Sequence, residues 1–371
     1  MKSLQFATII GACLGLAGVV SADTIYVAQD GSGDYTDIQA AIYAASDGDQ
    51  IMVGPGTYTG TGTAVFSLDG KAISVIATEG REATIIDGQN SRQGVRFEAE
   101  GSTGNALVDG FTITNGTPGI AGGSSATEIT FSDCLIANNS GGEGGGIEVN
   151  ASRLNLSGCT LIGNTSSANG GGIFAYTGTQ LYMENCYVAD NTANDGSGGG
   201  GGLFIGNLAT ATLVNCYFEN NTAANEGGGA IWAGGDLHLV GCQIRNNTAS
   251  SAGGGIELVG DHEVTMQSTL VCGNSPDQIK FHEGSTGWSD LGGNSIEQSC
   301  HDPSLITVNA DGSGDYPSIQ AAIDAANYGD AIELSAGIFY ESGLNTLGKT
   351  ISISGVGGPE GPQTTVDAEG A

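Results

Sequence analysis

The sequence is poor in charged residues, above all in basic ones, and it is poor in proline. Of its 371 residues 13% are charged, and 9 Lys and Arg stand against 40 Asp and Glu, which gives a net charge of −31. So few basic side chains argue against a nucleic-acid partner, because phosphate binding needs Lys and Arg. Only 7 prolines and no strict glycine period exclude collagen. Beyond the first 22 residues no apolar run is long enough to cross a membrane as a helix.

Glycine, by contrast, is abundant. The chain holds 65 Gly, about 17% of its residues against a usual value of about 7%. This much glycine weakens helices and excludes a helical bundle. A hydrophobic content of 39% argues against simple disorder. The composition therefore predicts an ordered protein with little helix.

Residues 1–22 are typical of a secretory signal peptide. Lys2 provides the positive start, an apolar stretch follows, and Val20-Ser21-Ala22 forms a small-residue cleavage site. A lipoprotein anchor at Cys13 is the alternative interpretation. We therefore expect a secreted protein, in the extracellular space or on the outer cell surface, where disulfides are stable.

A repeat of about 27 residues is the clearest signal in the chain. A Cys is followed two residues later by an apolar residue and five residues later by Asn, and Thr269 takes the Cys position in the last copy. The predicted inward Cys ladder is Cys134, Cys159, Cys186, Cys216 and Cys242. The predicted Asn ladder, in which amides of successive turns bond to one another, is Asn139, Asn164, Asn191, Asn221, Asn247 and Asn274. A row spread along an axis does not converge on one point, so we expect no metal there.

Short alternating segments lie on both sides of each Cys. Alternation gives one buried and one outer face, and a single unit cannot bury its apolar positions alone. Stacked units of three short strands predict an all-β fold, a right-handed parallel β-helix over residues 23–303 with regular coils at 129–275.

Residues 24–60 differ from the repeat. Ile38, Ala41, Ile42 and Ala45 share one face of a predicted helix, which would cap the open end of the β-helix. The same pattern returns at 305–341, so residues 304–371 are expected to begin a second, incomplete β-helix module. Stacking or assembly through that module is one expected consequence.

Cys272 and Cys300 stand outside the ladder, and in a secreted protein they are candidates for a disulfide. The N-x-[ST] triplets at Asn138, Asn164, Asn220 and Asn246 overlap the predicted turns, which explain them sufficiently.

An aromatic row is the candidate ligand site. Phe174, Phe204 and Trp232 occupy equivalent outward positions in successive coils, with Tyr176 nearby, and such rings could stack on sugars. The alternative is a stack that only protects strands or packs on a loop. The register at Trp232 is open by one residue, since Ala230 could point inward instead of Ile231.

Two resemblances follow from these motifs. FENN at 218–221 and GGAI at 228–231 resemble the paired repeats of the polymorphic outer-membrane protein (chlamydial-type) family, which implies a surface-exposed adhesive passenger. DGSGDYTDIQAAI at 30–42 resembles the pectin-lyase-like superfamily, which implies a polysaccharide lyase, esterase, hydrolase or epimerase. The catalytic patterns of pectinesterases, pectate lyases and polygalacturonases are absent, so no catalytic residue is assigned.

We therefore expect a secreted or cell-surface β-helix that acts in adhesion, in binding of a polysaccharide or cell-surface glycan, or as a structural spacer, without catalysis. No cofactor is expected, although calcium could bridge the acidic protein to a polyanion such as pectate, which it would otherwise repel. The alternative is a carbohydrate-active enzyme of the pectin-lyase-like type, for which the acid–His string at Asp261, His262 and Glu263 is a weak pointer.

Overall fold

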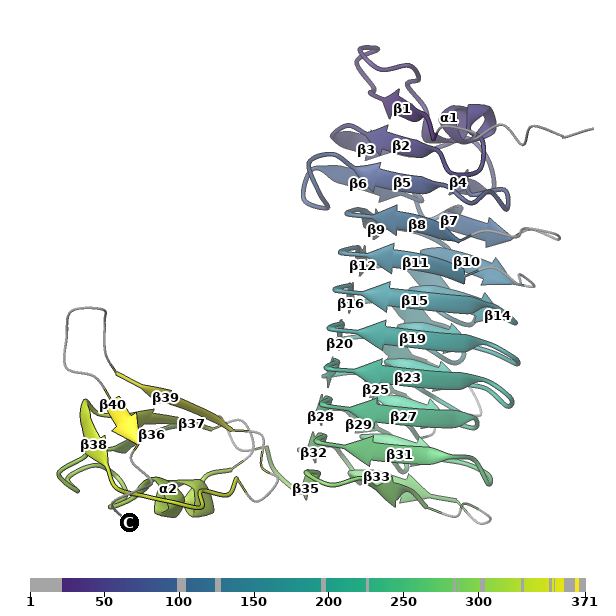
Figure 1. The fold of residues 1–371 in the computed structure, drawn as a ribbon. Helices are drawn as coiled ribbons and strands as arrows, with labels where there is room; N and C mark the ends of the chain where they lie inside the picture. Colours follow the sequence, from purple (N-terminus) through teal and green to yellow (C-terminus); the bar gives the residue numbers. More distant parts are fainter. Residues whose placement is uncertain are drawn as a thin grey trace, which may run out of the picture.

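The coils of the chain stack into a long parallel β-helix in the computed structural model (Figure 1). The structure describes residues 22–98, 105–123, 128–194, 198–224, 227–282, 285, 287–300, 304–327, 330–346, 349, 351–356 and 364–366. Nearly all of the predicted signal peptide lies outside these residues. No helix among the described residues has the length and apolarity to cross a membrane.

Three long parallel sheets run along the molecule, each built from one strand per coil. We call them sheets A, B and C, with 11, 10 and 9 strands. Sheet A contains β1 (Thr24–Val27), β2 (Gln50–Val53), β5 (Ser74–Ala77), β8 (Ala106–Asp109), β11 (Glu128–Ser132), β15 (Arg153–Ser157), β19 (Gln180–Glu184), β23 (Thr210–Val214), β27 (Asp236–Val240), β31 (Val264–Gln267) and β34 (Ser289–Asp290). Sheet B contains β3 (Gly56–Tyr58), β6 (Thr84–Asp87), β9 (Thr112–Thr114), β12 (Leu135–Ala137), β16 (Thr160–Ile162), β20 (Tyr187–Ala189), β24 (Tyr217–Glu219), β28 (Gln243–Arg245), β32 (Leu270–Cys272) and β35 (Ser295–Glu297). Sheet C contains β4 (Ala64–Ser67), β7 (Gln93–Glu98), β10 (Ile120–Gly123), β14 (Ile147–Asn150), β18 (Ile173–Ala175), β22 (Leu203–Ile205), β26 (Ile231–Ala233), β30 (Ile256–Leu258) and β33 (Ile279–Phe281).

The three strands expected in each coil are present, and the parallel β-helix prediction is confirmed. The central coils add a fourth strand of two residues, because the residues after the ladder Asn are extended enough to pair between coils. This 5-stranded sheet D contains β13 (Ser140–Gly141), β17 (Thr165–Ser166), β21 (Thr192–Ala193), β25 (Thr222–Ala223) and β29 (Thr248–Ala249).

The interior is one continuous apolar column, because each coil places the same positions inward. In the coil that begins at β15, Leu154, Leu156, Cys159, Leu161 and Ile173 are all buried. Equivalent residues stack on those of the next coil, as the pairing of Leu154 with Leu181 shows for sheet A. Burial of each such side chain stabilises the fold by roughly 1.5–3 kcal/mol.

Helix α1 (Ile38–Ala44) covers the first coil, as predicted. Its buried residues Ile38, Ala41 and Ile42 join the interior column. Asp37 accepts a hydrogen bond from the Ala40 amide at 2.9 Å at the helix N-terminus. At the other end Lys71 Nζ donates to three backbone carbonyls, including that of Ile42 at 2.6 Å. Both ends of a very short helix are thus bonded.

The second copy of this cap is built in the same way. It contains β36 (Leu305–Val308), α2 (Ile319–Ala325), β37 (Ala331–Leu334), β38 (Gly337–Phe339), β39 (Ser352–Gly355) and β40 (Thr364–Val366). Ser318 caps α2, and Lys349 Nζ donates to the carbonyls of Ile323 and Asp324. This unit has an apolar cluster of its own. Its status as the start of a second β-helix module stays a prediction.

Candidate functional site

The predicted aromatic row lies on the face of sheet C that points away from the interior. Phe174 pairs with Phe204, and Phe204 pairs with Trp232, so Ile231 points inward and the open register is resolved. Ring centroids are 4.9 Å apart for the first pair and 4.4 Å for the second, and the planes are nearly parallel. Tyr176 stacks on Phe174 at 5.3 Å. The rings therefore present their faces mainly to one another.

This row is also covered. Phe174 is 9% and Phe204 7% exposed, whereas Tyr176 is 45% exposed. A Cβ atom at Gly198 would collide with the Phe204 ring, so the chain that precedes β22 lies directly against the row. The stack thus packs beneath a loop. Glycan binding by these residues stays a prediction, and Tyr176 and the half-buried Trp232 are the rings of the row that reach solvent.

Two acidic residues flank the row along the same line of sheet C. Glu148 pairs with Phe174, and Glu257 pairs with Trp232. Burial, and secondarily the charge of Glu143, raises the pKa of Glu148. Three aromatic side chains separate the two carboxyl groups, so they do not form a paired acid and base.

The two predicted ladders lie inside the coils. All six ladder asparagines are buried. Asn164 illustrates their bonding, because its amide nitrogen donates to Asn191 Oδ1 at 2.9 Å and to the Ile136 carbonyl at 2.9 Å. The five ladder cysteines are free and buried. The five side chains stack along the apolar interior, which they fill as small apolar groups.

Cys272 and Cys300 form a disulfide with an S–S distance of 2.08 Å. It connects strand β32 of the last regular coils to the segment after β35. Cys272 itself packs with Leu270 in a small cluster of its own.

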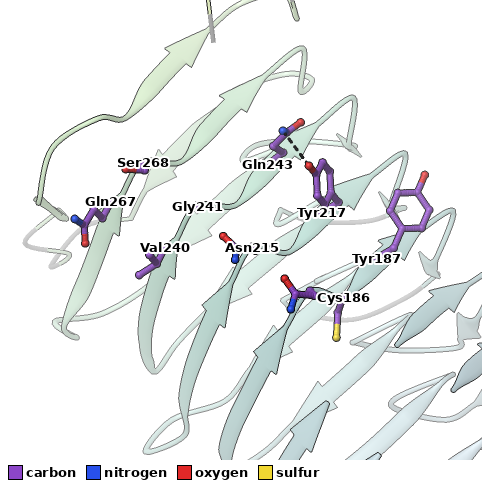
Figure 2. Close-up of a pocket in the computed structure, with 10 residues that line it drawn as sticks. Cys186, Tyr187, Asn215, Tyr217, Val240, Gly241, Gln243, Gln267 and Ser268 are labelled. Carbon is purple, nitrogen blue, oxygen red and sulfur yellow. Dashed lines mark hydrogen bonds between the residues drawn. The ribbon is translucent and has the colours of Figure 1, made fainter. Parts of the chain in front are cut away.

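A groove follows the corner between sheets A and B over four successive coils (Figure 2). We call it the corner groove. Its volume is about 610 Å³, and its lining residues are Asn185, Cys186, Tyr187, Asn215, Tyr217, Val240, Gly241, Gln243, Gln267 and Ser268. The lining consists of amides, hydroxyls, two tyrosine rings and small apolar groups. It contains no Asp, Glu, Lys, Arg or His.

Each of the four corners in the corner groove turns on a left-handed residue. Asn185, Asn215, Gly241 and Ser268 have φ values of 53°, 51°, 65° and 47°. Asn tolerates this conformation and glycine adopts it freely. At Gly241 a Cβ atom would collide with Oδ1 of Asn215, so a larger residue there would displace the Asn215 side chain.

The hydroxyl groups of the two tyrosines in the corner groove form hydrogen bonds with side chains of sheet B. The Tyr187 hydroxyl donates to Glu219 Oε2 at 2.8 Å, and Arg245 Nε lies 3.1 Å from Glu219 Oε1. Burial, followed by the hydrogen bond to Glu219, raises the pKa of Tyr187 to about 12. Gln243 Nε2 donates to the Tyr217 hydroxyl at 3.4 Å. Figure 2 shows the two rings projecting from neighbouring coils.

A second hollow of about 580 Å³ lies on the outer face of sheet A. Its lining includes Glu128, Arg153, Asn155, Gln180 and Tyr182. Asn155 donates its amide to Glu128. This hollow therefore combines a cation and a carboxylate, unlike the corner groove.

The three histidines that the structure describes each contact a different side chain, and that of His282 is Glu257. His262 Nδ1 lies 3.9 Å from Asp236 Oδ1, and His238 Nδ1 lies 3.0 Å from Thr265 Oγ1. Within the part of the chain that the structure describes, no three His, Cys, Asp or Glu side chains gather where they could hold a metal ion.

Sequence reasoning missed the corner groove. A signal was present, since the residue before each ladder Cys is one that tolerates left-handed geometry, for example Asp133, Asn185, Asn215 and Gly241. The side chains that line the corner groove differ from coil to coil, so they form no repeated motif.

Comparison with protein families agrees with this architecture. Residues 73–244 match the family model described as a right handed beta helix region. The handedness expected from parallel connections is therefore supported. No curated protein is significantly similar to the chain in sequence.

Several solved structures are similar to the chain at low identity. Pectate lyase Pel9A has a TM-score of 0.41 and 14% identity, over 92% of this chain and 80% of that one. An alginate lyase from Paenibacillus sp. has a TM-score of 0.37 and 15% identity, over 75% of this chain and 98% of that one. Pectin methylesterase from carrot has a TM-score of 0.31 and 14% identity, over 94% of this chain and 89% of that one. At these TM-scores the likeness carries no argument about activity.

Proposed function

We propose that this protein is a non-catalytic β-helix of the extracellular space or cell surface, and that it binds a glycan in the corner groove. The observation that carries the proposal is the lining of the groove, which offers neutral amides and two supported tyrosine rings over four coils. Sugar hydroxyls need hydrogen-bond donors and acceptors, and the apolar face of a sugar ring packs on an aromatic side chain.

The predicted signal peptide and the resemblance to polymorphic outer-membrane protein repeats support an adhesive role at the surface. In that role the stacked coils would also hold the binding groove away from the point of attachment. The net charge of −31 disfavours a polyanionic ligand unless calcium bridges the two.

A carbohydrate-active enzyme is the second candidate. The hollow on sheet A favours it, because Arg153 and Glu128 lie there together. Enzymatic cleavage would be expected in that hollow, and glycan retention in the corner groove.

Binding to a panel of neutral and acidic polysaccharides, with and without calcium, tests the proposal. We expect retention of at least one polysaccharide without any change in its chain length. Replacing both Tyr187 and Tyr217 by Ala should lower the affinity roughly tenfold to hundredfold, since each stacked ring contributes about 0.5–1.5 kcal/mol.

Tyr176→Ala and Tyr182→Ala are the matched controls, because both remove an exposed tyrosine from another face. Both variants should bind like the unaltered protein. Cleavage of any polysaccharide, or loss of binding in Tyr176→Ala with the double variant unaffected, would refute the proposal.

A further inference from the structure

The corner groove is long in one direction and narrow in the other. It spans four corners, at Asn185, Asn215, Gly241 and Ser268. Across its width it uses only the last residues of sheet A strands, such as Val240 and Gln267, and the first residues of sheet B strands. An extended ligand therefore fits along the axis of the coils and not across it.

Equivalent positions of the groove repeat once per coil. Tyr187 pairs with Tyr217, Tyr217 with Gln243, and Val240 with Gln267, each in parallel register. Parallel strands in register lie about 4.8 Å apart. A pyranose chain with extended β-1,4 linkages advances by a similar distance with each sugar residue.

The lining of the groove favours an uncharged ligand. The carboxylate that Tyr187 contacts, that of Glu219, is also paired with Arg245, and no basic side chain lines the groove. A uronate would leave its own carboxylate without a partner of opposite charge. The hydroxyls of a neutral sugar match the amides of Asn185, Asn215, Gln243 and Gln267.

Given the proposed function, on which this step rests, we infer that the ligand is a neutral glycan with extended β-1,4 linkages, which lies along the coil axis with one sugar residue at each corner. Tyr187 and Tyr217 provide ring-stacking positions at one end. Gln243 and Gln267 provide hydrogen bonds at the other end.

A length series of cello-oligosaccharides and manno-oligosaccharides, from one to six sugar residues, tests this by isothermal titration calorimetry. Affinity should rise with each added residue up to four and then level off, in at least one series. A plateau at one or two residues would overturn the axial arrangement, although polysaccharide retention would still stand. Binding of polygalacturonate but of no neutral glycan would overturn the ligand class. Absence of binding to every glycan would reject the proposed function as well.

Tyr187→Ala is a second test of the axial arrangement, because Tyr187 lines the first corner of the groove. The variant should bind the four-residue oligosaccharide no better than the unaltered protein binds the three-residue one, and it should bind shorter oligosaccharides unchanged. Tyr187→Phe keeps the ring and should retain the affinity, which separates ring stacking from a folding defect. An equal loss at every length in Tyr187→Ala would contradict one residue per corner.

Discussion

At the scale of single residues, the buried asparagines distinguish this chain from one that merely alternates apolar and polar positions. Each ladder amide nitrogen donates to a backbone carbonyl of the preceding coil, and from Asn139 to Asn247 it also donates to the ladder Asn of the next coil. Asn191 Oδ1, for example, accepts from both the backbone N–H and the side-chain amide of Asn164, at 3.0 and 2.9 Å. A buried donor that loses its acceptor bears the full cost of its desolvation.

Asn191→Ala should therefore destabilise the protein by about 3 kcal/mol or more, since it leaves two buried donors without an acceptor. A lower midpoint of urea unfolding, followed by circular dichroism, would show this. Asn207→Ala is the control, because Asn207 is exposed and lies outside the ladder. Equal midpoints for the two variants would contradict the role assigned to the ladder.

The positions of residues that recur in every coil can be predicted from the sequence. The role of a residue that depends on its surroundings in the fold cannot. The ladder positions were found from spacing because every coil demands the same amide. Phe174 and Phe204 were correctly expected on the outer side of sheet C. The sequence left open whether these rings bind a ligand or pack on a loop, because their cover depends on where the chain around Gly198 folds back.

At the scale of elements, the cap helices depend on contacts from the next coil. Helix α1 has 7 residues, too few to be stable alone. The ammonium group of Lys71 bonds to its last carbonyls, where a positive charge also interacts favourably with the helix dipole. Lys349 makes the corresponding bonds to α2.

Lys71→Met should loosen α1, since it removes charged hydrogen bonds that each contribute about 1.5–3 kcal/mol. Hydrogen exchange would show this as faster exchange of the Ala41 and Ala45 amides. Lys349→Met is the matched control and should affect only the Ala322 and Ala326 amides. Unchanged protection of α1 in Lys71→Met would count against this capping role.

At the scale of the whole molecule, each coil contacts mainly its two neighbours. Stability in such a structure is close to a sum of coil and interface contributions, so its ends open before its middle. The Cys272–Cys300 disulfide lies at the end remote from α1, across 28 residues of sequence.

Replacing both Cys272 and Cys300 by Ser should speed hydrogen exchange in β33 to β35 and leave the coils from β15 to β27 unchanged. The disulfide restricts the unfolded segment and contributes about 2–4 kcal/mol locally. A reducing agent should reproduce the effect in the unaltered protein and add nothing in the variant. Faster exchange throughout the central coils would contradict local coupling.

The corners of successive coils lie in register, which limits the insertions and duplications that this fold can accept during evolution. Duplicating one repeat of about 27 residues inserts a complete rung, and every flanking side chain keeps its face. Inserting part of a repeat shifts the register and turns outward residues inward. In the proposed binding mode, the length of ligand that the corner groove can hold would therefore change by whole coils.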